Sequence, residues 1–172
     1  KIPDIDSNDQ ARQFLLLMEW MEAGGYEHYE ISNFALPCNR SRHNSSYWQG
    51  ENYLGLGPSA HSFNRKSRQW NISNNALYIQ ALKKNKLLFE IEQLTSTQQL
   101  NEYIMTSLRT KEGIDNNYIL KQFGSGESKR IQQSALFYLN QELLIENENK
   151  FTLTRQGKLF ADGIAAGLFA ET

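Results

Sequence analysis

The chain has 172 residues, of which 40% are hydrophobic and 12% aromatic, and its formal net charge is −1. This composition is typical of a folded globular protein and excludes a disordered one. The near-zero charge argues against binding to nucleic acid or to an anionic membrane surface, and no apolar run approaches the roughly 18–20 residues that span a bilayer.

The single cysteine limits both the compartment and the metal chemistry. Cys38 cannot form an internal disulfide, which is typical of a reducing compartment, so we expect a cytoplasmic protein. One thiol also cannot hold an iron–sulfur cluster, which needs about four ligands. No signal peptide is visible. Because the chain opens on Lys1 rather than methionine and runs at once toward a helix, we expect a fragment of a longer protein.

The first half is predicted to form an α/β layer with parallel strands. Asp6 or Ser7 caps a first helix, which ends at Gly24-Gly25. The aromatic segment 26–34 predicts one buried strand. Further elements follow in chain order: an irregular segment over 36–52 with one helical turn at 43–48, a short strand at 53–56, a Gly-x-Gly-Pro turn at 55–58, a hairpin that pairs 61–63 with 69–72, and a helix that ends near Asn85.

The second half is predicted to be helical with one hairpin. In chain order we expect a helix capped by Thr95 or Ser96, a helix ending at Gly124, a helix from Ser128 with Ile131, Ala135, Leu136 and Leu139 inward, a hairpin over 143–153, and a last helix capped by Thr154. Three helices, a two-stranded wing and a closing helix predict a winged-helix-like α+β domain over residues 91–172, after a first unit over residues 1–90.

All three histidines fall within residues 28–61, which points to this region for chemistry. His43 and Tyr47 stand four residues apart and share a face if the turn is helical. Imidazole and phenolate both ligate haem iron, and Trp48 could pack on a flat macrocycle. The alternative is that His43 caps a loop and Tyr47 belongs to the core, and for an isolated motif this alternative is favoured.

The other candidate signals favour structural roles. His28 and His61 are expected to be buried, hydrogen-bonded histidines, and the turn at 55–58 lacks the third glycine and the lysine of phosphate-binding loops. A winged-helix domain suggests DNA binding, but the only basic residues at the start of its third helix are Lys129 and Arg130, and the wing tip is acidic. Phosphate contact needs a basic face, so a structural or partner-docking role is favoured.

Three neighbouring blocks together carry a family resemblance. They are Tyr26-Glu-His-Tyr-Glu-Ile-Ser-Asn-Phe-Ala-x-Pro37, Ser41-Arg-His-Asn-x-x-Tyr-Trp48, and Tyr53-Leu-Gly-x-Gly-Pro-x-Ala-His-Ser62, with Arg109-x-Lys-Glu-Gly-Ile-Asp115 further on. Their order and spacing resemble the oxygen-independent coproporphyrinogen III oxidase-like radical SAM family. The resemblance implies the C-terminal portion of such a protein: the last helix and strand of a partial TIM-like radical SAM barrel, followed by the winged-helix-like domain.

The resemblance also implies cofactors and two possible activities. Members use S-adenosylmethionine (SAM) at a [4Fe-4S] cluster, whose Cys-x-x-x-Cys-x-x-Cys ligands would lie before Lys1. The block His43-Asn-x-x-Tyr-Trp48 is similar to the haem-chaperone branch, in which haem passes to an acceptor protein. By that resemblance His43 and Tyr47 would contact haem, and Ala35 and His61 would lie against SAM. The alternatives are a porphyrinogen-decarboxylating oxidase and, from another class, a DNA-binding winged helix. This fragment alone is expected to be inactive.

Overall fold

The structure, a computed structural model, describes residues 6–171. Its first half contains α1 (Ser7–Ala23), β1 (Glu27–Glu30), β2 (Asn33–Ala35), α2 (Arg42–Trp48), β3 (His61–Phe63), β4 (Ser67–Asn71), α3 (Asn75–Lys83) and β5 (Phe89–Gln93). Its second half contains α4 (Ser96–Leu108), β6 (Ile114–Asp115), α5 (Asn116–Phe123), α6 (Ser125–Asn140), β7 (Leu144–Asn147), β8 (Lys150–Leu153), the 3-10 helix η1 (Gly157–Phe160) and α7 (Ala161–Gly167).

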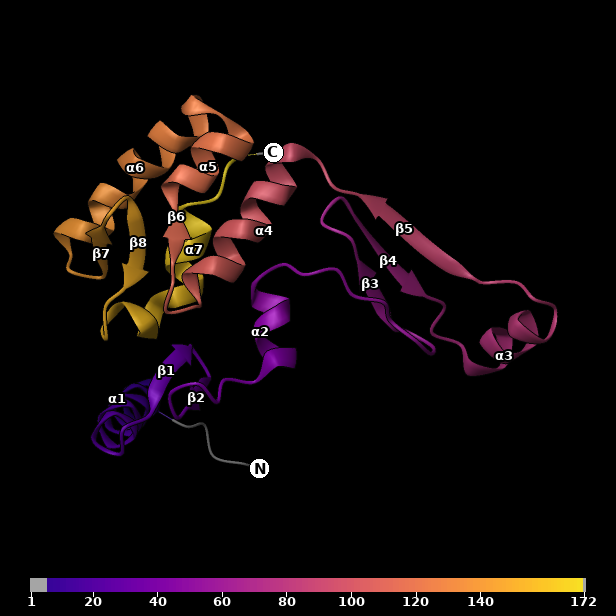
Figure 1. Ribbon diagram of the computed structural model, residues 1–172, viewed down its shortest axis with the longest axis horizontal. Helices are drawn as coiled ribbons and strands as arrows, with labels where there is room; N and C mark the ends of the chain where they lie inside the picture. The colour runs from indigo at the N-terminus through magenta and orange to yellow at the C-terminus, as the bar shows by residue number, and fades with distance from the viewer. Residues whose placement is uncertain (1–5, 172) are drawn as a thin grey trace.

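Figure 1 shows three regions. The second half forms one body, α1 and the β1–β2 hairpin lie beside it, and the β3–β4–β5 sheet extends away with α3 at its end. We call residues 61–93, which form this extension, the arm. α2 lies between the hairpin and the arm, next to α4.

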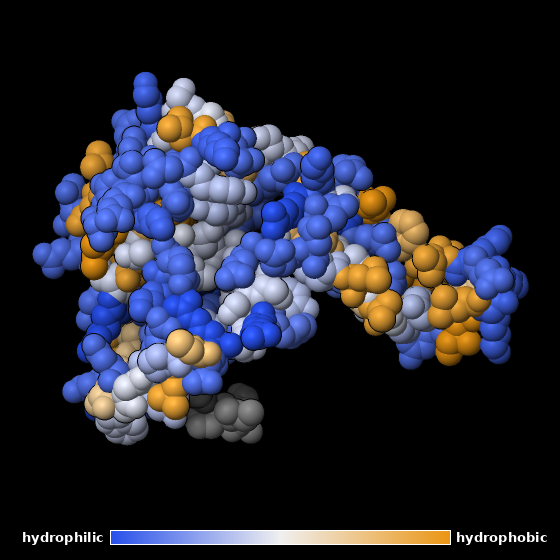
Figure 2. Space-filling model, in the orientation of Figure 1, coloured by the Kyte–Doolittle hydropathy of each residue, from blue (hydrophilic) through white to orange (hydrophobic). Residues whose placement is uncertain are grey.

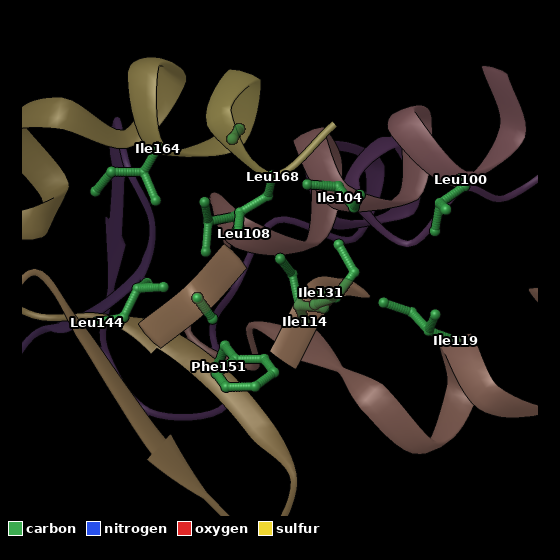
Figure 3. Packing of buried hydrophobic residues seen from close by; sticks show 12 residues of the cluster. Leu100, Ile104, Leu108, Ile114, Ile119, Ile131, Leu144, Phe151, Ile164 and Leu168 are labelled. Atoms are coloured by element: carbon green, nitrogen blue, oxygen red, sulfur yellow. The ribbon is translucent and has the colours of Figure 1, made fainter. Parts of the chain in front are cut away.

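The hydrophobic core lies in the second half and is built on one face of α4. Leu100, Ile104 and Leu108 recur every four residues, so they share a helix face, and each is at most 1% exposed. They pack with apolar side chains from the other elements of this half (Figure 3), namely Ile114, Ile119, Ile131, Ala135, Leu144, Phe151, Ile164, Ala165 and Leu168. Each large buried side chain stabilises the fold by about 1.5–3 kcal/mol, so this cluster anchors the helices around it.

Local signals explain where the helices of this half begin. Thr95 and Gln98 form a reciprocal capping box at α4, and the Asp115 carboxylate accepts the N–H groups of residues 117 and 118 to begin α5. Thr154 Oγ1 accepts the N–H of Gly157 at 2.9 Å. The turn that Thr154 caps is the 3-10 helix η1, and α7 follows it.

The prediction of one buried strand over residues 26–34, in a layer of parallel strands, is wrong. The segment folds back as the antiparallel hairpin β1–β2, and every strand pair in residues 6–171 is antiparallel. The turn forms because the Glu30 carboxylate accepts the backbone N–H of Ser32 at 3.1 Å and the side-chain amide of Asn33 at 2.6 Å. These local hydrogen bonds compete with the formation of a continuous strand. The aromatic residues of the segment favoured a strand and gave no sign of the turn.

Other expectations need smaller corrections. The strand expected at 53–56 is a single bridge between Tyr53 and Phe63. The helix expected from Ser128 begins at Ser125, and Leu136, expected inward, is 54% exposed. The strands β5 and β6 were not anticipated: β5 adds to β4 of the predicted hairpin, and β6 pairs with β8. The predicted boundaries of α1, α3, α4 and α5 are otherwise confirmed to within a few residues.

The arm carries many exposed apolar side chains. Figure 2 shows them as orange patches along the extension. Exposed members on the arm are Leu77, Ile79, Leu82, Leu87, Leu88, Phe89 and Ile91. Monomeric proteins rarely expose apolar area of this kind over a continuous region, so the arm has the composition of a contact surface. No helix in the described part of the chain is long and apolar enough to cross a membrane.

Candidate functional site

The predicted turn at 43–48 is a helix, and it holds His43 and Tyr47 on one face. Ser41 caps α2, because its hydroxyl accepts the N–H of Asn44 at 3.2 Å. The imidazole of His43 and the ring of Tyr47 meet edge to face, with centroids 5.1 Å apart and an interplanar angle of 85°. Both residues are exposed. The structural alternative, in which His43 caps a loop and Tyr47 belongs to the core, does not describe this arrangement.

A cavity of about 530 Å³ lies against α2. Its walls come from α2, β1, the arm, α4 and α5 with the loops next to them. They are rich in aromatic rings, namely Tyr29, Tyr47, Trp48, Tyr53, Phe63, Tyr103, Tyr118 and Phe123. Among the described residues the lining includes Tyr47 but not its neighbour His43. The volume lies within the roughly 300–1,000 Å³ of sites that hold organic ligands.

Ion pairs of Arg40 hold the loop that precedes α2. The Arg40 guanidinium donates to Glu27 and to Glu112, both at 2.7 Å, and Lys111 donates to the other oxygen of Glu27 at 2.7 Å. Hydrogen bonds from Arg40 and Lys111 hold the pKa of Glu27 at about 2, far below its ordinary range. The same pairing raises the pKa of Arg40. Arg40 and Glu112 also line the cavity, so its wall contains an ion pair of fixed geometry.

A buried carboxylate ties the hairpin to the second half. Glu30 is 2% exposed and accepts a hydrogen bond from Arg109 Nε at 3.1 Å. Arg109 also donates to Asp162 at 2.8 Å, and its guanidinium carbon lies 5.0 Å from the centre of the Trp48 ring. No sequence pattern pointed to a role for Arg40. Glu30 and Arg109 both lie in blocks that carry the family resemblance, which is the signal that could have singled them out.

His28 has the structural role that was predicted for it. Its Nδ1 accepts from Lys158 Nζ at 2.9 Å, and its Nε2–H donates to the carbonyl of Ile31 at 2.9 Å. The ring stacks on Phe34 with centroids 4.1 Å apart. Burial lowers the pKa of His28, and burial also lowers the pKa of Lys158. The neutral imidazole is therefore the form that this site holds.

Ala35 and His61, the residues expected near SAM, are not brought to the cavity. Ala35 is buried at the end of β2, and His61 is exposed at the start of β3, near Trp70. Among the described residues neither lines the cavity. A Cβ on Gly55 would lie 2.2 Å from the carbonyl oxygen of His61. Glycine is therefore needed at position 55 because the backbone of His61 packs directly against it, and no space for a ligand is left there.

The described residues do not fit an iron–sulfur cluster. Within residues 6–171, no group of three or more His, Cys, Asp or Glu side chains is placed to hold a metal ion. Cys38, the one cysteine of the chain, is exposed.

Comparison with known proteins gives three consistent results. Residues 94–160 match the family model of the HemN C-terminal domain. The heme chaperone HemW of Lactococcus lactis is 30% identical over 157 residues, which are 91% of this chain and 41% of that protein. HemW of Bacillus subtilis is 30% identical over 164 residues, which are 94% of this chain and 43% of that protein.

One solved structure shares the fold. Coproporphyrinogen III oxidase HemN from Escherichia coli superposes with a TM-score of 0.67 over 90% of this chain and 39% of that protein, at 17% sequence identity. The chain thus spans about two fifths of the length of the relatives it matches. These results confirm the resemblance carried by the motifs: residues 94–160 belong to the HemN C-terminal domain family, and the chain is similar to HemW proteins over more than nine tenths of its length.

Proposed function

We propose that this chain supplies the haem-contacting segment of a haem chaperone that acts in porphyrin metabolism and delivers haem to an acceptor protein. The observation that carries the proposal is the cavity beside α2, which Tyr47 and Trp48 line while His43 stands one helical turn before Tyr47. The names of the relatives, which are heme chaperones, support it.

The residues present suit a flat iron-bearing macrocycle as cargo. Aromatic walls can stack on a porphyrin, and a phenolate or an imidazole can ligate its iron. Tyr47 lines the cavity, whereas His43 is exposed and absent from the described lining, so Tyr47 is the group that we place nearest to a ligand inside the cavity. His43 would then contact haem from outside or during transfer.

The test is a haem titration of the full-length protein followed by the Soret band. We expect His43→Ala and Tyr47→Phe each to weaken binding by at least about tenfold, which is about 1.4 kcal/mol, and Tyr47→Phe to change the spectrum of ferric haem. Tyr26→Phe is the matched control, because Tyr26 and Tyr47 are both 41% exposed and Tyr26 lies outside the lining of the cavity. Unchanged affinity and spectrum in both test variants would remove α2 from the haem site.

The fold of HemN motivates a second candidate, an oxygen-independent coproporphyrinogen III oxidase. The [4Fe-4S] cluster and SAM would supply the radical chemistry in the full-length protein, and we propose that Ala35 and His61 lie near SAM there. Anaerobic turnover of coproporphyrinogen III by the full-length protein decides between the candidates. Stoichiometric release of CO₂ would displace the chaperone proposal.

We further propose a division into residues 1–90, the end of a partial TIM-like barrel, and residues 91–172, a winged-helix-like domain. Support comes from α4, α5 and α6 with the β6–β8–β7 sheet, which has the β7–β8 hairpin as its wing. We assign this domain a structural role rather than DNA binding, since the net charge of the chain is −1. Duplex binding that falls steeply with salt would contradict this assignment.

A further inference from the structure

The orientation of α2 depends on very few contacts. None of its seven residues, all within the described part of the chain, is buried. A helix of this length is not stable alone in water, because isolated helices shorter than about 12–15 residues are marginal. Its side chains meet the rest of the protein through Asn44, whose amide donates to the Tyr29 hydroxyl at 3.4 Å, through the Tyr47–Tyr53 ring contact, and through Trp48.

Trp48 is the link between α2 and the second half. One face of its indole ring receives the guanidinium of Arg109 at 5.0 Å, a cation–π geometry. The indole N–H is buried and has no hydrogen-bond partner among residues 6–171, so no hydrogen bond fixes the ring. Trp48 lines the cavity, whereas Arg109 is absent from the described lining. Arg109 therefore stands behind the wall that Trp48 forms.

Arg109 is itself held in place on several sides. Its side chain is 19% exposed, with Nε on Glu30 and Nη1 on Asp162. Its carbonyl accepts the N–H of Ile31 at 3.0 Å. A planar guanidinium can pair along its edge and stack on its face at the same time, which a lysine ammonium cannot do. The side chain thus presents a fixed flat surface to the indole.

We propose that Arg109 is a positioning residue for the haem site: it fixes Trp48 and, through Trp48, the α2 face that carries His43 and Tyr47. This inference rests on the proposed function for its ligand, but it makes a claim about α2 that haem-free protein can test. Without the guanidinium, α2 samples other orientations, and ligand binding must then order it, which weakens affinity.

The first experiment measures hydrogen–deuterium exchange of the peptide covering residues 42–48 in the full-length protein without haem. Arg109→Met is expected to speed exchange there by about tenfold, which is about 1.4 kcal/mol, because Trp48 loses a partly desolvated cation–π contact. Arg155→Met is the matched control, since Arg155 also pairs with a carboxylate, Glu22, but on an exposed site of α1. If Arg109→Met fails to fold, Arg109→Lys keeps the charge and the Glu30 partner, and about threefold faster exchange is expected. Exchange unchanged in the folded variant overturns the proposal.

The second experiment is a double-mutant cycle on haem affinity. Arg109→Met and Trp48→Leu are each expected to weaken binding about tenfold, and the double variant no further, because both remove the same contact. Arg109→Met should also broaden the ferric haem spectrum into mixed ligation states, which a purely structural loss would not do. Additive effects would refute coupling between the two residues. Wild-type protein that binds no haem, with faster exchange still seen in Arg109→Met, would refute the proposed function and leave the positioning of α2 supported.

Discussion

Among single side chains outside the hydrophobic core, the buried carboxylate of Glu30 is the one whose removal should lower the free energy of unfolding most. Glu30→Ala deletes the acceptor of three donors: Arg109 Nε at 3.1 Å, Ser32 N–H at 3.1 Å and the Asn33 amide at 2.6 Å. Two effects add in the variant. The donors lose charge-assisted hydrogen bonds, and Arg109 is left beside a space from which water is largely excluded.

The size of this loss depends on how well other groups compensate the charge of Arg109 once Glu30 is removed. Breaking a buried ion pair by removing one partner costs about 3–5 kcal/mol. Arg109 retains Asp162 at 2.8 Å, and its side chain is 19% exposed, so water reaches part of it. We therefore expect a loss near the lower limit, about 3 kcal/mol in the free energy of unfolding. Glu30→Gln keeps one acceptor oxygen and should lose about 1.5 kcal/mol.

Urea unfolding followed by circular dichroism measures this loss. Glu22→Ala is the control, because Glu22 makes an ion pair with Arg155 but is 72% exposed. Exposed pairs are worth about 0–1 kcal/mol, so the control should move the midpoint little. A loss from Glu30→Ala no larger than that from Glu22→Ala would refute the reasoning, since it would mean that Glu30 is solvated in solution.

Two further predictions concern single positions. Because burial lowers the pKa of His28, only the unfolded chain takes up a proton as the pH first falls below about 6.5, so stability should drop from pH 7.5 to pH 5. His28→Gln should flatten that drop in urea midpoints, and His61→Gln, at an exposed site, should preserve it. A Cβ on Gly157 would lie 1.9 Å from the Leu143 carbonyl oxygen, so Gly157→Ala should cost about 2 kcal/mol or more in thermal unfolding. Gly163→Ala, in α7 with no atom within 4 Å of the new Cβ, should gain about 0.5–1 kcal/mol; equal effects at the two glycines would contradict the packing.

The helices of the second half were predictable because their signals are local. The capping box at Thr95, the apolar spacing of Leu100, Ile104 and Leu108, and Gly124 as a helix end all act within a few residues. The hairpin β1–β2 was not predictable in the same way. Its turn depends on Glu30, whose burial is compensated by Arg109, a residue 79 positions later in the chain. A single sequence does not reveal such long-range pairs.

The candidate site was predictable in part. The four-residue spacing of His43 and Tyr47 predicted a shared helix face, and the structure has that face. The cavity beside it was not predictable, because its walls come from α2, β1, the arm, α4 and α5, which meet only in the folded chain. From the sequence, His43 and Tyr47 are equally good candidates for a ligand. In the structure they differ, because Tyr47 lines the cavity and His43 is absent from the described lining.

One short segment after α4 connects the second half to everything around α2. Arg109 contacts Glu30 and Trp48, the N–H of Lys111 donates to the carbonyl of Tyr29 at 3.0 Å, and Glu112 accepts from Arg40. Because α2 has no buried residue of its own, its order depends on contacts such as that between Arg109 and Trp48, and on the loop and hairpin that the segment holds beside it. The rigid core under α4 then fixes where the segment 109–112 stands. The second half thus lines part of the cavity itself and also holds Trp48, the loop before α2 and the β1–β2 hairpin in one geometry around it.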